Sequence, residues 1–213
     1  MYVFLDADPI EDAFKTSESN SYIRILHAVP NAPAVDVYAD GKLLAQALAF
    51  KKITQYLSVP HGNYTIRIYP AGQKTNAVLT RRVHIPENAV FTVAATGILP
   101  NISLFTIHEH THAQTSGKAC VRFVHLSPNA PAVDVKLADG KMVFDNVSYK
   151  GITNSVCLQE GNYSFKVTPA SSETTVLNVP NVTLTANTYH TVYAVGLVGK
   201  TPPLEALIET DPR

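Results

Sequence analysis

The sequence predicts an all-β protein that consists of two tandem Greek-key β-sandwich domains of the immunoglobulin-like or transthyretin-like type. Three observations support this prediction: an internal repeat, apolar residues that alternate with polar ones, and turn residues at the ends of the apolar runs. Helical periodicity of useful length is missing. The 213 residues provide about a hundred for each copy of the repeat, which is long enough for each copy to form its own core.

The repeat is clearest in one eleven-residue motif. HAVPNAPAVDV occupies residues 27–37, and HLSPNAPAVDV occupies residues 125–135. The offset is 98 residues up to the V-D-V segment and 99 residues after it, so one residue is inserted before the second D-G turn, where a hairpin tolerates an insertion. Three further segments keep their order in both copies: a D-G-K turn at 40–42 and 139–141, an I-T strand at 50–54 and 149–153, and a G-N-Y sequence at 62–64 and 161–163.

The repeat divides the chain into five predicted parts. They are an acidic N-terminal tail (1–19), the first sandwich (20–109), a polar linker (110–117), the second sandwich (118–208) and a C-terminal tail (209–213). The N-terminal tail carries five acidic residues and one lysine, whereas the first sandwich carries eight basic residues and four acidic ones. These opposite net charges suggest that the tail lies across the first sandwich, and the alternative is a solvated tail.

Alternation defines the opening strand of each copy. In the first copy, Ile23, Ile25 and His27 share one face, whereas Tyr22 and Arg24 share the other. We therefore predict a half-buried strand with one apolar and one polar face. The second copy repeats the pattern with Val121, Phe123 and His125 on one face and Cys120 and Arg122 on the other.

Turn chemistry supports the remaining strands. The D-G pairs suit tight hairpins, because a positive φ costs little for glycine and is tolerated by aspartate. The G-N-Y sequences resemble the tyrosine corner of Greek-key sandwiches, in which a phenol binds nearby backbone. Further β-rich runs, each bounded by Pro, Gly or Asn, are TIRIYP, LTRRVHI, VFTVAATGI and ISLFTI.

The repeated motif has two interpretations. In the structural one, the prolines stiffen a connector, the histidine ends a strand in phase with the core, and the Asn and Asp side chains cap backbone amides. In the functional one, His and Asp form a metal site or an acid–base pair. We favour the structural interpretation, because two ligands are too few for most metals and no nucleophile stands beside them. The residues concerned are His27, Pro30, Asn31, Pro33 and Asp36, with His125, Pro128, Asn129, Pro131 and Asp134.

Two features occur in only one copy. His108, His110 and His112 would project from one side of an extended strand, an arrangement that suits zinc, but solvated imidazoles in a linker are the simpler interpretation. Cys120 and Cys157 both fall in the second copy and lie off its apolar face. The sequence leaves open whether these two cysteines form a disulfide.

Charge and motifs exclude several classes of function. Acidic and basic residues balance at seventeen each, so no overall positive field recruits nucleic acid. No apolar run approaches the ~20 residues that span a bilayer, and the N-terminal segment lacks the features of a signal peptide, so we expect no membrane insertion and no export signal. No dinucleotide-binding, P-loop or nucleophile-elbow motif occurs. We therefore predict neither enzymatic activity nor a cofactor.

Taken together, the H-x-x-P-N-A-P-x-V-D-V motif, the D-G-K turn, the I-T strand and the G-N-Y corner resemble the bacterial and archaeal family called domain of unknown function 4397. The resemblance implies tandem β-sandwich domains, commonly in exported or cell-envelope proteins, and brings no catalytic residues with it. It favours an extracellular or envelope location, whereas the absence of a signal peptide in this chain leaves a cytoplasmic location open.

We therefore expect a non-enzymatic cell-envelope or surface-associated module that binds a protein or a glycan, or that spaces other components. The alternative is a metal-binding protein or a metal-dependent hydrolase that uses the three histidines or the His and Asp pairs of the motif. Glycan recognition would need exposed aromatic rings. Candidates for these rings are Tyr2, Tyr38, Tyr56, Tyr69 and Tyr193.

Overall fold

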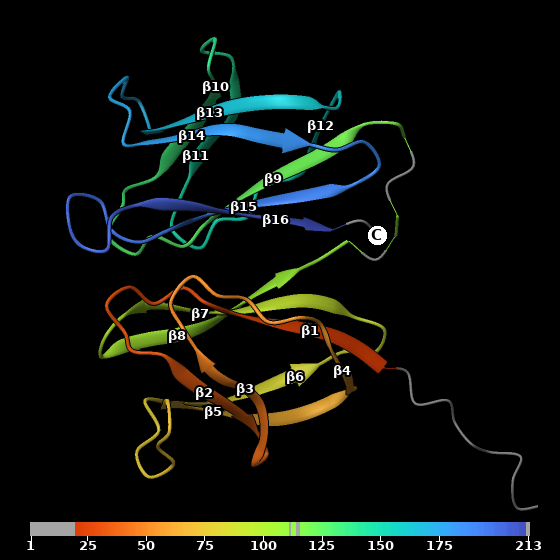
Figure 1. The fold of residues 1–213 in the computed structure, drawn as a ribbon, viewed down its shortest axis with the longest axis vertical. Coiled ribbons are helices and arrows are strands. Elements are labelled where there is room, and N and C mark those ends of the chain that lie inside the picture. Colours follow the sequence, from red (N-terminus) through yellow and green to blue (C-terminus); the bar gives the residue numbers. More distant parts are fainter. Residues whose placement is uncertain (1–19, 111, 114–115, 212–213) are drawn as a thin grey trace, which may run out of the picture.

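The computed structural model describes residues 20–110, 112–113 and 116–211. These residues form sixteen β-strands arranged as two sandwiches, which confirms the predicted all-β class and tandem arrangement (Figure 1). Within the described part of the chain, no helix is long and apolar enough to cross a membrane. The acidic tail, and with it the hypothesis that the tail lies across the first sandwich, falls outside the described residues.

The first sandwich consists of two four-stranded sheets, with strand orders β4-β1-β7-β8 and β3-β2-β5-β6. Strands β1 and β7 run parallel, and the other neighbours in these two sheets are antiparallel. The strands are β1 (Asn20–His27), β2 (Val35–Ala39), β3 (Lys42–Leu48), β4 (Leu57–Pro60), β5 (Gly62–Pro70), β6 (Leu79–Ile85), β7 (Val90–Ile98) and β8 (Asn101–His108).

The second sandwich repeats this topology strand for strand, with orders β12-β9-β15-β16 and β11-β10-β13-β14. The order differs from the immunoglobulin order, in which strands A, B, E and D form one sheet and C, F and G the other, so the transthyretin-like alternative describes it better. The strands are β9 (Ala119–His125), β10 (Val133–Leu137), β11 (Met142–Val147), β12 (Val156–Leu158), β13 (Gly161–Pro169), β14 (Leu177–Leu184), β15 (Tyr189–Val195) and β16 (Glu205–Asp211). Because β16 continues to Asp211, residues 209–211 of the predicted C-terminal tail belong to the last strand.

The predicted tyrosine corners are present in both sandwiches, and the two-residue D-G hairpin is present in the first. In the second sandwich only Gly140 of the D-G pair has a positive φ, and four residues separate β10 from β11. Asp40 and Gly41, which join β2 to β3, have φ angles of 45° and 87°, in the left-handed region that a two-residue hairpin requires. The phenol of Tyr64 donates a hydrogen bond to the carbonyl of Pro60 over 2.9 Å. In the second sandwich, Tyr163 does the same to Gln159 over 2.9 Å, so both G-N-Y sequences form tyrosine corners.

The two cores differ in continuity. The second sandwich has one continuous cluster of buried apolar side chains, which includes Phe144 and Phe165. The core of the first sandwich is divided into two clusters. At the positions of those two phenylalanines the first sandwich has Ala45 and Ile66, so its interior contains less side-chain volume there.

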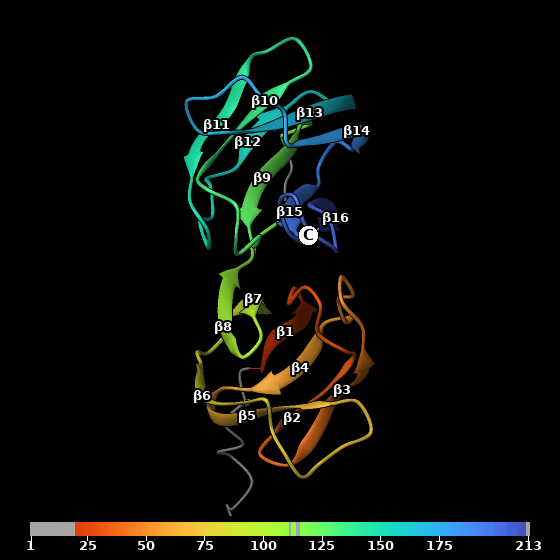
Figure 2. The same cartoon turned by 90° about the vertical axis from the view of Figure 1, so that its left-hand side faces the viewer.

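The two sandwiches pack against each other through the sheets that contain β1 and β9, so the molecule has four β layers (Figures 1 and 2). The prediction of half-buried opening strands was therefore wrong. The face that carries Arg24 or Arg122 is covered by the other sandwich, and both arginines are only 5% exposed. An arginine on a strand with alternating residues normally marks the face that is exposed to solvent. The alternation of polar and apolar residues alone cannot show that a second domain covers this face. The buried apolar residues at the boundary are Leu26, Ala28, Ala94 and Ile107 of the first sandwich and Val124, Leu126, Tyr193 and Val195 of the second.

Candidate functional site

The motif histidines bind backbone groups with both ring nitrogens. In the first sandwich, the N–H of Val29 donates to Nδ1 of His27 over 3.3 Å, so Nε2 carries the hydrogen and donates to the carbonyl of Pro33 over 3.1 Å. The ring is 1% exposed, and burial lowers its pKa, which favours the neutral form. His125 makes the equivalent contacts, with Ser127 and Pro131. Each histidine therefore fastens the end of its strand to the P-N-A-P turn.

The motif aspartates hold a bulge in the neighbouring strand. Asp36 accepts hydrogen bonds from the backbone N–H of Ala47 over 2.7 Å and of Gly72 over 2.9 Å, and these two bonds lower the pKa of its carboxyl. Asp134 accepts the equivalent bond from Asn146 over 2.8 Å. Both bonded residues in the bulged strands, Ala47 and Asn146, have a positive φ, so the carboxylate stabilises a backbone conformation that L-residues seldom adopt.

The motif prolines and asparagines shape the connector and bind the neighbouring loops. Pro30 and Pro128 begin the turns, in which the asparagine is the second residue. Asn129 exchanges two hydrogen bonds of 2.9 Å with the backbone of Val198, within its own sandwich. Asn31 instead donates to the carbonyl of Thr201, in the other sandwich, over 2.8 Å. These contacts support the structural interpretation of the motif.

The three histidines near the predicted linker do not come together as a metal site. The ring of His110 stacks on Tyr189 with centroids 3.6 Å apart, and its Nε2 lies 3.1 Å from the hydroxyl of Ser155. Its pKa is lowered, first by burial and then by a nearby arginine. His108 contacts a phenylalanine ring of its own sheet, and His112 is exposed. Among the described residues, which include all three histidines, no group of three His, Cys, Asp or Glu side chains is arranged to hold a metal ion.

Glu109, between two of those histidines, is a residue whose role the sequence did not indicate. Its side chain is 3% exposed and lies between Arg24 of the first sandwich, 3.1 Å away, and Arg122 of the second. The hydroxyl of Thr92 also donates to it, over 2.5 Å. The predicted linker region therefore begins beside a buried ion triad that joins the two sandwiches. The sequence does show an arginine at the same position of both copies, which could have suggested a shared role. No sequence pattern, however, links these two arginines to Glu109.

The two cysteines form a disulfide between directly paired positions of β9 and β12. Cys120 is 1% exposed, whereas Cys157 is exposed at the sheet edge. The first sandwich has Tyr22 and Ser58 at the equivalent positions, and these two residues are also directly paired. The same strand pairing is therefore crosslinked in one sandwich and not in the other.

Two of the five candidate tyrosines meet at the outer face of the first sandwich, where Tyr69 is half-buried and Tyr38 is 7% exposed. The rings of Tyr38 and Tyr69 lie 5.7 Å apart in an edge-to-face arrangement, and the ammonium of Lys74 lies 5.1 Å from the centre of the Tyr38 ring. Together with Gly41 and Arg67 these residues line a surface hollow of about 180 Å³.

The other three candidate tyrosines do not lie at this hollow. Tyr193 and Tyr56 lie at the boundary between the sandwiches, where Tyr193 is fully buried and the Tyr56 ring packs against the guanidinium of Arg24. Tyr2 is outside the described residues.

A second hollow of about 550 Å³ continues along the same sheet. It is lined by residues of β5 and β6 that include Asn63, Thr65, Arg82 and His84. The two hollows share strand β5, and its outward residues from position 63 to position 69 extend over about 20 Å. We call this surface the basic face and define it as Tyr38, Asn63, Thr65, Arg67, Tyr69, Lys74, Arg82 and His84.

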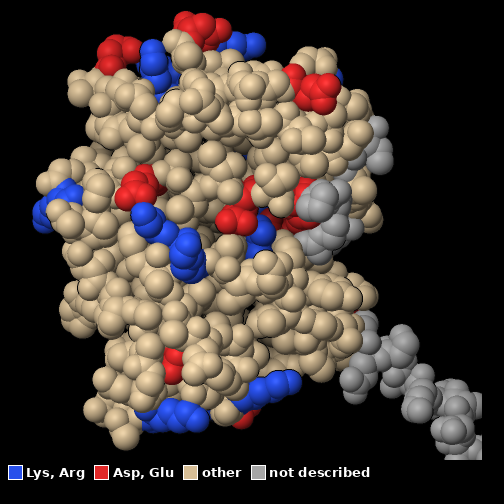
Figure 3. Space-filling view, viewed as in Figure 1, with Lys and Arg blue, Asp and Glu red and all other residues tan. Residues whose placement is uncertain are grey.

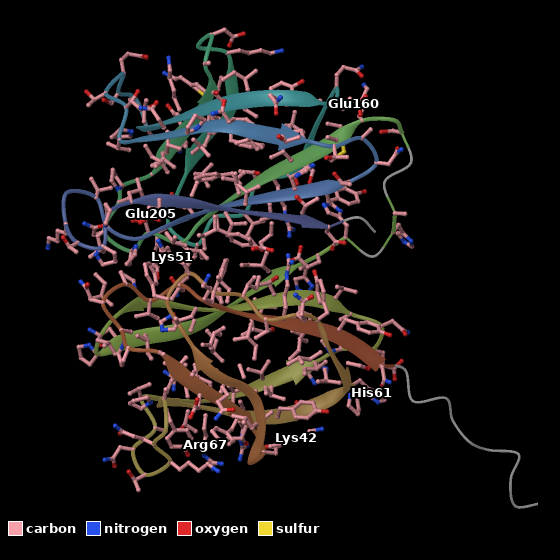
Figure 4. All side chains as sticks on the ribbon, viewed as in Figure 1. Lys42, Lys51, His61, Arg67, Glu160 and Glu205 are labelled. Atoms are coloured by element: carbon pink, nitrogen blue, oxygen red, sulfur yellow. A yellow bond between two sulfur atoms is a disulfide. The ribbon has the colours of Figure 1, made fainter. Side chains whose placement is uncertain are left out.

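The cations of the basic face make no close ion pair within the described part of the chain, although Lys74 is near enough to Asp36 to help lower the pKa of that carboxyl. None of Arg67, Lys74 and Arg82 forms an ion pair there. The nearby carboxylates of Asp36 and Asp40 instead accept hydrogen bonds from backbone amides. Lysine and arginine side chains accordingly gather at the lower end of the molecule in Figure 3, where Figure 4 labels Arg67.

The second sandwich lacks this combination. At the positions of Tyr38 and Tyr69 it has Lys136 and Thr168. The ammonium of Lys136 pairs with Glu173 over 2.9 Å, so its charge is already neutralised. The pair of aromatic rings is therefore specific to the first sandwich.

Among solved structures 16 chains match, including the following three, and curated proteins gave no match. The Bacillus anthracis TIE protein is 16% identical with a TM-score of 0.25, and the match covers 87% of this chain and 34% of that one, so this chain spans about a third of its length. The CBM26-family module CBMbc from Eubacterium rectale Amy13K, in complex with maltoheptaose, is 11% identical with a TM-score of 0.29 and coverages of 89% and 96%. A streptococcal virulence factor described as binding alpha-glucan is 12% identical with a TM-score of 0.25 and coverages of 90% and 97%. At these identities and TM-scores, the three structures bear on neither the ligand nor the activity of this chain.

The family comparison is more informative, because it matches nearly the whole chain. One family model, described as "Domain of unknown function (DUF4397)", matches residues 21–136 and again residues 137–213. This double match agrees with the repeated motif and with the two sandwiches of equal topology. The chain therefore belongs to the DUF4397 family.

Proposed function

We propose that this protein is a non-enzymatic binding module of the cell envelope or cell surface, and that the basic face of the first sandwich binds an acidic glycan. The observation that carries the proposal is the row of outward residues on β5, which combines amide, hydroxyl, guanidinium and aromatic groups over about 20 Å. An elongated, shallow surface suits a polymer chain better than a compact metabolite, which prefers a deep pocket.

The chemistry of the row fits a sugar acid. A tyrosine such as Tyr69 has an apolar ring for the C–H face of a sugar and a hydroxyl for its polar groups. The guanidinium of Arg67 can bind a carboxylate with two parallel hydrogen bonds, and Lys74 adds a second positive charge. Asn63 and Thr65 offer amide and hydroxyl groups to sugar hydroxyls farther along the strand.

The disulfide supports an envelope or extracellular location. Structural disulfides persist in oxidising compartments and are rare in the cytosol. The bond between Cys120 and Cys157 joins strands that are already paired, so its formation requires no rearrangement of the sheet. The proposed location is thus consistent with a ligand of the envelope.

The test is titration calorimetry with polygalacturonate as the acidic polymer and dextran as the neutral one. We expect polygalacturonate to bind, and the variant Arg67→Ala to bind it at least about tenfold more weakly, because hydrogen bonds to charged groups contribute about 1.5 to 3 kcal/mol. Tyr69→Ala should weaken binding about fivefold. The matched controls are Lys166→Ala and Thr168→Ala, the equivalent positions of the second sandwich, which should bind like the unmodified protein.

Two results would contradict the proposal. Equal affinity for dextran and polygalacturonate would show that charge does not contribute to binding. An affinity for polygalacturonate that does not change with added salt would show the same, because salt screens exposed charges. Equal losses in Arg67→Ala and Lys166→Ala would show that the first sandwich is not the specific site.

A further inference from the structure

The first sandwich has a cavity that opens between its two sheets. Strands β3 and β4 are the edge strands of different sheets on one side of the sandwich, whereas on the opposite side the edge strands β6 and β8 contact each other. Between β3 and β4 lies a cavity of about 220 Å³, which reaches the core residues Ile23, Ile66 and Ile85. Leu43, at its mouth, is 41% exposed. The core of the first sandwich is therefore open to solvent on one side.

Apolar side chains dominate the lining. Besides the three isoleucines, Leu44, Leu57 and Val59 form the walls, and Tyr64 lies beside the mouth. An apolar cavity of about 150 Å³ in another protein stays free of water and binds benzene. A cavity of this size and lining is therefore suited to an apolar group rather than to water.

The second sandwich fills the corresponding space with a larger side chain. Phe165 takes the place of Ile66, is 3% exposed, and stacks on Tyr163 with ring centroids 6.4 Å apart. Phe165 belongs to the continuous core cluster of that sandwich. The repeat thus has two versions of one site, open in the first sandwich and closed by an aromatic ring in the second.

The rim of the cavity carries one charge. Lys42 is the only charged residue among the described residues that line the cavity, and it forms no ion pair with any of them. Its side chain is exposed at the start of β3 (Figure 4). A ligand with an apolar body and an anionic head would bury the body between the sheets and place the head beside this ammonium.

The geometry points to a second binding site in the first sandwich, between β3 and β4, which takes a short aliphatic carboxylate of about eight carbons. The apolar chain enters past Leu43 and contacts Ile66, and the carboxylate pairs with Lys42 at the rim. This site lies between the sheets, whereas the basic face lies on the outer surface of one of them. The two sites use different side chains for binding, although Tyr64 borders both hollows.

The experiment compares octanoate, octanol and octylamine, which share one chain and differ in the head group. Binding is followed by titration calorimetry and by chemical shift changes of the methyl groups of Leu43 and Ile66. We expect octanoate to bind more tightly than octanol, and octylamine to bind most weakly. Lys42→Ala should weaken octanoate about two- to fivefold and leave octanol unchanged, because an exposed ion pair contributes little.

A second set of variants tests the cavity itself. Ile66→Phe imports the residue of the second sandwich and should weaken all three ligands by about tenfold or more, while melting at the same temperature as the unmodified protein or higher. Leu57→Trp, on the opposite wall, provides a second way to fill the space if Ile66→Phe does not fold. Leu43→Ala should alter octanoate binding, and its matched control Met142→Ala, at the equivalent exposed position of the second sandwich, should not.

Three outcomes would overturn the inference. The first is the absence of octanoate binding at millimolar concentration. The second is unchanged binding in a folded Ile66→Phe or Leu57→Trp variant. The third is equal binding of octanoate and octylamine, which would leave an apolar cavity without the proposed carboxylate preference.

Discussion

In the first sandwich, Ala45 and Ile66 stand where the second sandwich has Phe144 and Phe165, and the two cores differ accordingly. The first is divided and contains an open cavity, whereas the second is continuous. The shared motif does not prevent this divergence, because its hydrogen bonds satisfy backbone groups and leave the core positions free to vary. Duplicated domains can therefore keep one fold while one copy becomes more firmly packed and the other more open.

The outer faces of the two sandwiches also differ, and again the first is the one that suits a ligand. The first sandwich carries cations without a close ion pair beside a half-buried Tyr69 and a buried Tyr38, whereas in the second the ammonium of Lys136 is neutralised by Glu173. The second sandwich also has the disulfide. The features that support binding are thus concentrated in the first sandwich, and the features that support stability in the second.

The largest expected effect concerns the boundary between the sandwiches. Glu109→Ala leaves two buried arginines without their shared carboxylate, and breaking a buried ion pair costs about 3 to 5 kcal/mol. We expect urea unfolding, followed by circular dichroism, to separate into two transitions. The less stable transition should belong to the first sandwich, whose core is divided.

The control is Lys51→Ala, which removes an exposed ion pair between the sandwiches. Lys51 lies 2.6 Å from Glu205, and both side chains are more than a third exposed (Figure 4). Exposed pairs contribute less than about 1 kcal/mol, so this variant should unfold much like the unmodified protein. If both variants lost the same stability, the buried triad would not be what couples the sandwiches.

A smaller effect, of about 3 kcal/mol, is expected from the disulfide. The variant Cys120→Ala with Cys157→Ala removes a crosslink between residues 37 positions apart, so the unfolded chain gains conformational freedom. We expect thermal unfolding of the second sandwich to shift to lower temperature. The reciprocal variant, Tyr22→Cys with Ser58→Cys, places cysteines at the paired positions of the first sandwich, where an oxidised bond should raise its melting temperature. A stable second sandwich after cysteine removal would show that its continuous core is sufficient.

The alternation and the turn residues were enough to predict the sandwiches, the D-G hairpins and the tyrosine corners, because these depend on local chemistry. The boundary between the sandwiches could not be predicted. It depends on Arg24, Glu109 and Arg122, whose encounter is a tertiary event across two domains. The contact between Tyr38 and Tyr69 could not be predicted either. Both were candidates for glycan recognition, but only the pairing of β2 with β5 brings their rings together.

The motif aspartates should contribute to stability in both sandwiches. Asp36→Ala removes the acceptor of two backbone amides, those of Ala47 and Gly72, whereas Asp134→Ala removes the acceptor of one, that of Asn146. Measured by urea unfolding, both variants should lose about 1 to 3 kcal/mol, and the loss should be larger for Asp36→Ala. A loss confined to one sandwich would mean that the aspartates do not have one shared structural role.

The smallest expected effect is a difference in how stability depends on pH. Burial lowers the pKa of His27, His125 and His190 below the ordinary value of 6.5. Below that pH the unfolded chain binds protons that the folded chain does not, so the free energy of unfolding decreases as the pH falls. The first two histidines belong to the shared motif, whereas the position of the third is occupied by Phe91 in the first sandwich.

Exchanging the residues at this position isolates the third histidine. His190→Phe should reduce the loss of stability between about pH 7 and pH 5, because one fewer buried imidazole is protonated on unfolding. The comparison uses the slope with pH, since the variant also removes the acceptor for the N–H of Thr185 and so lowers stability at every pH. Phe91→His, the reciprocal change, buries an imidazole in the first sandwich, where the phenylalanine is 1% exposed, and should steepen the slope. If the free energy of unfolding had the same slope with pH in both variants and in the unmodified protein, a histidine at this position would bind protons equally in the folded and unfolded chain. Burial would then not keep His190 neutral.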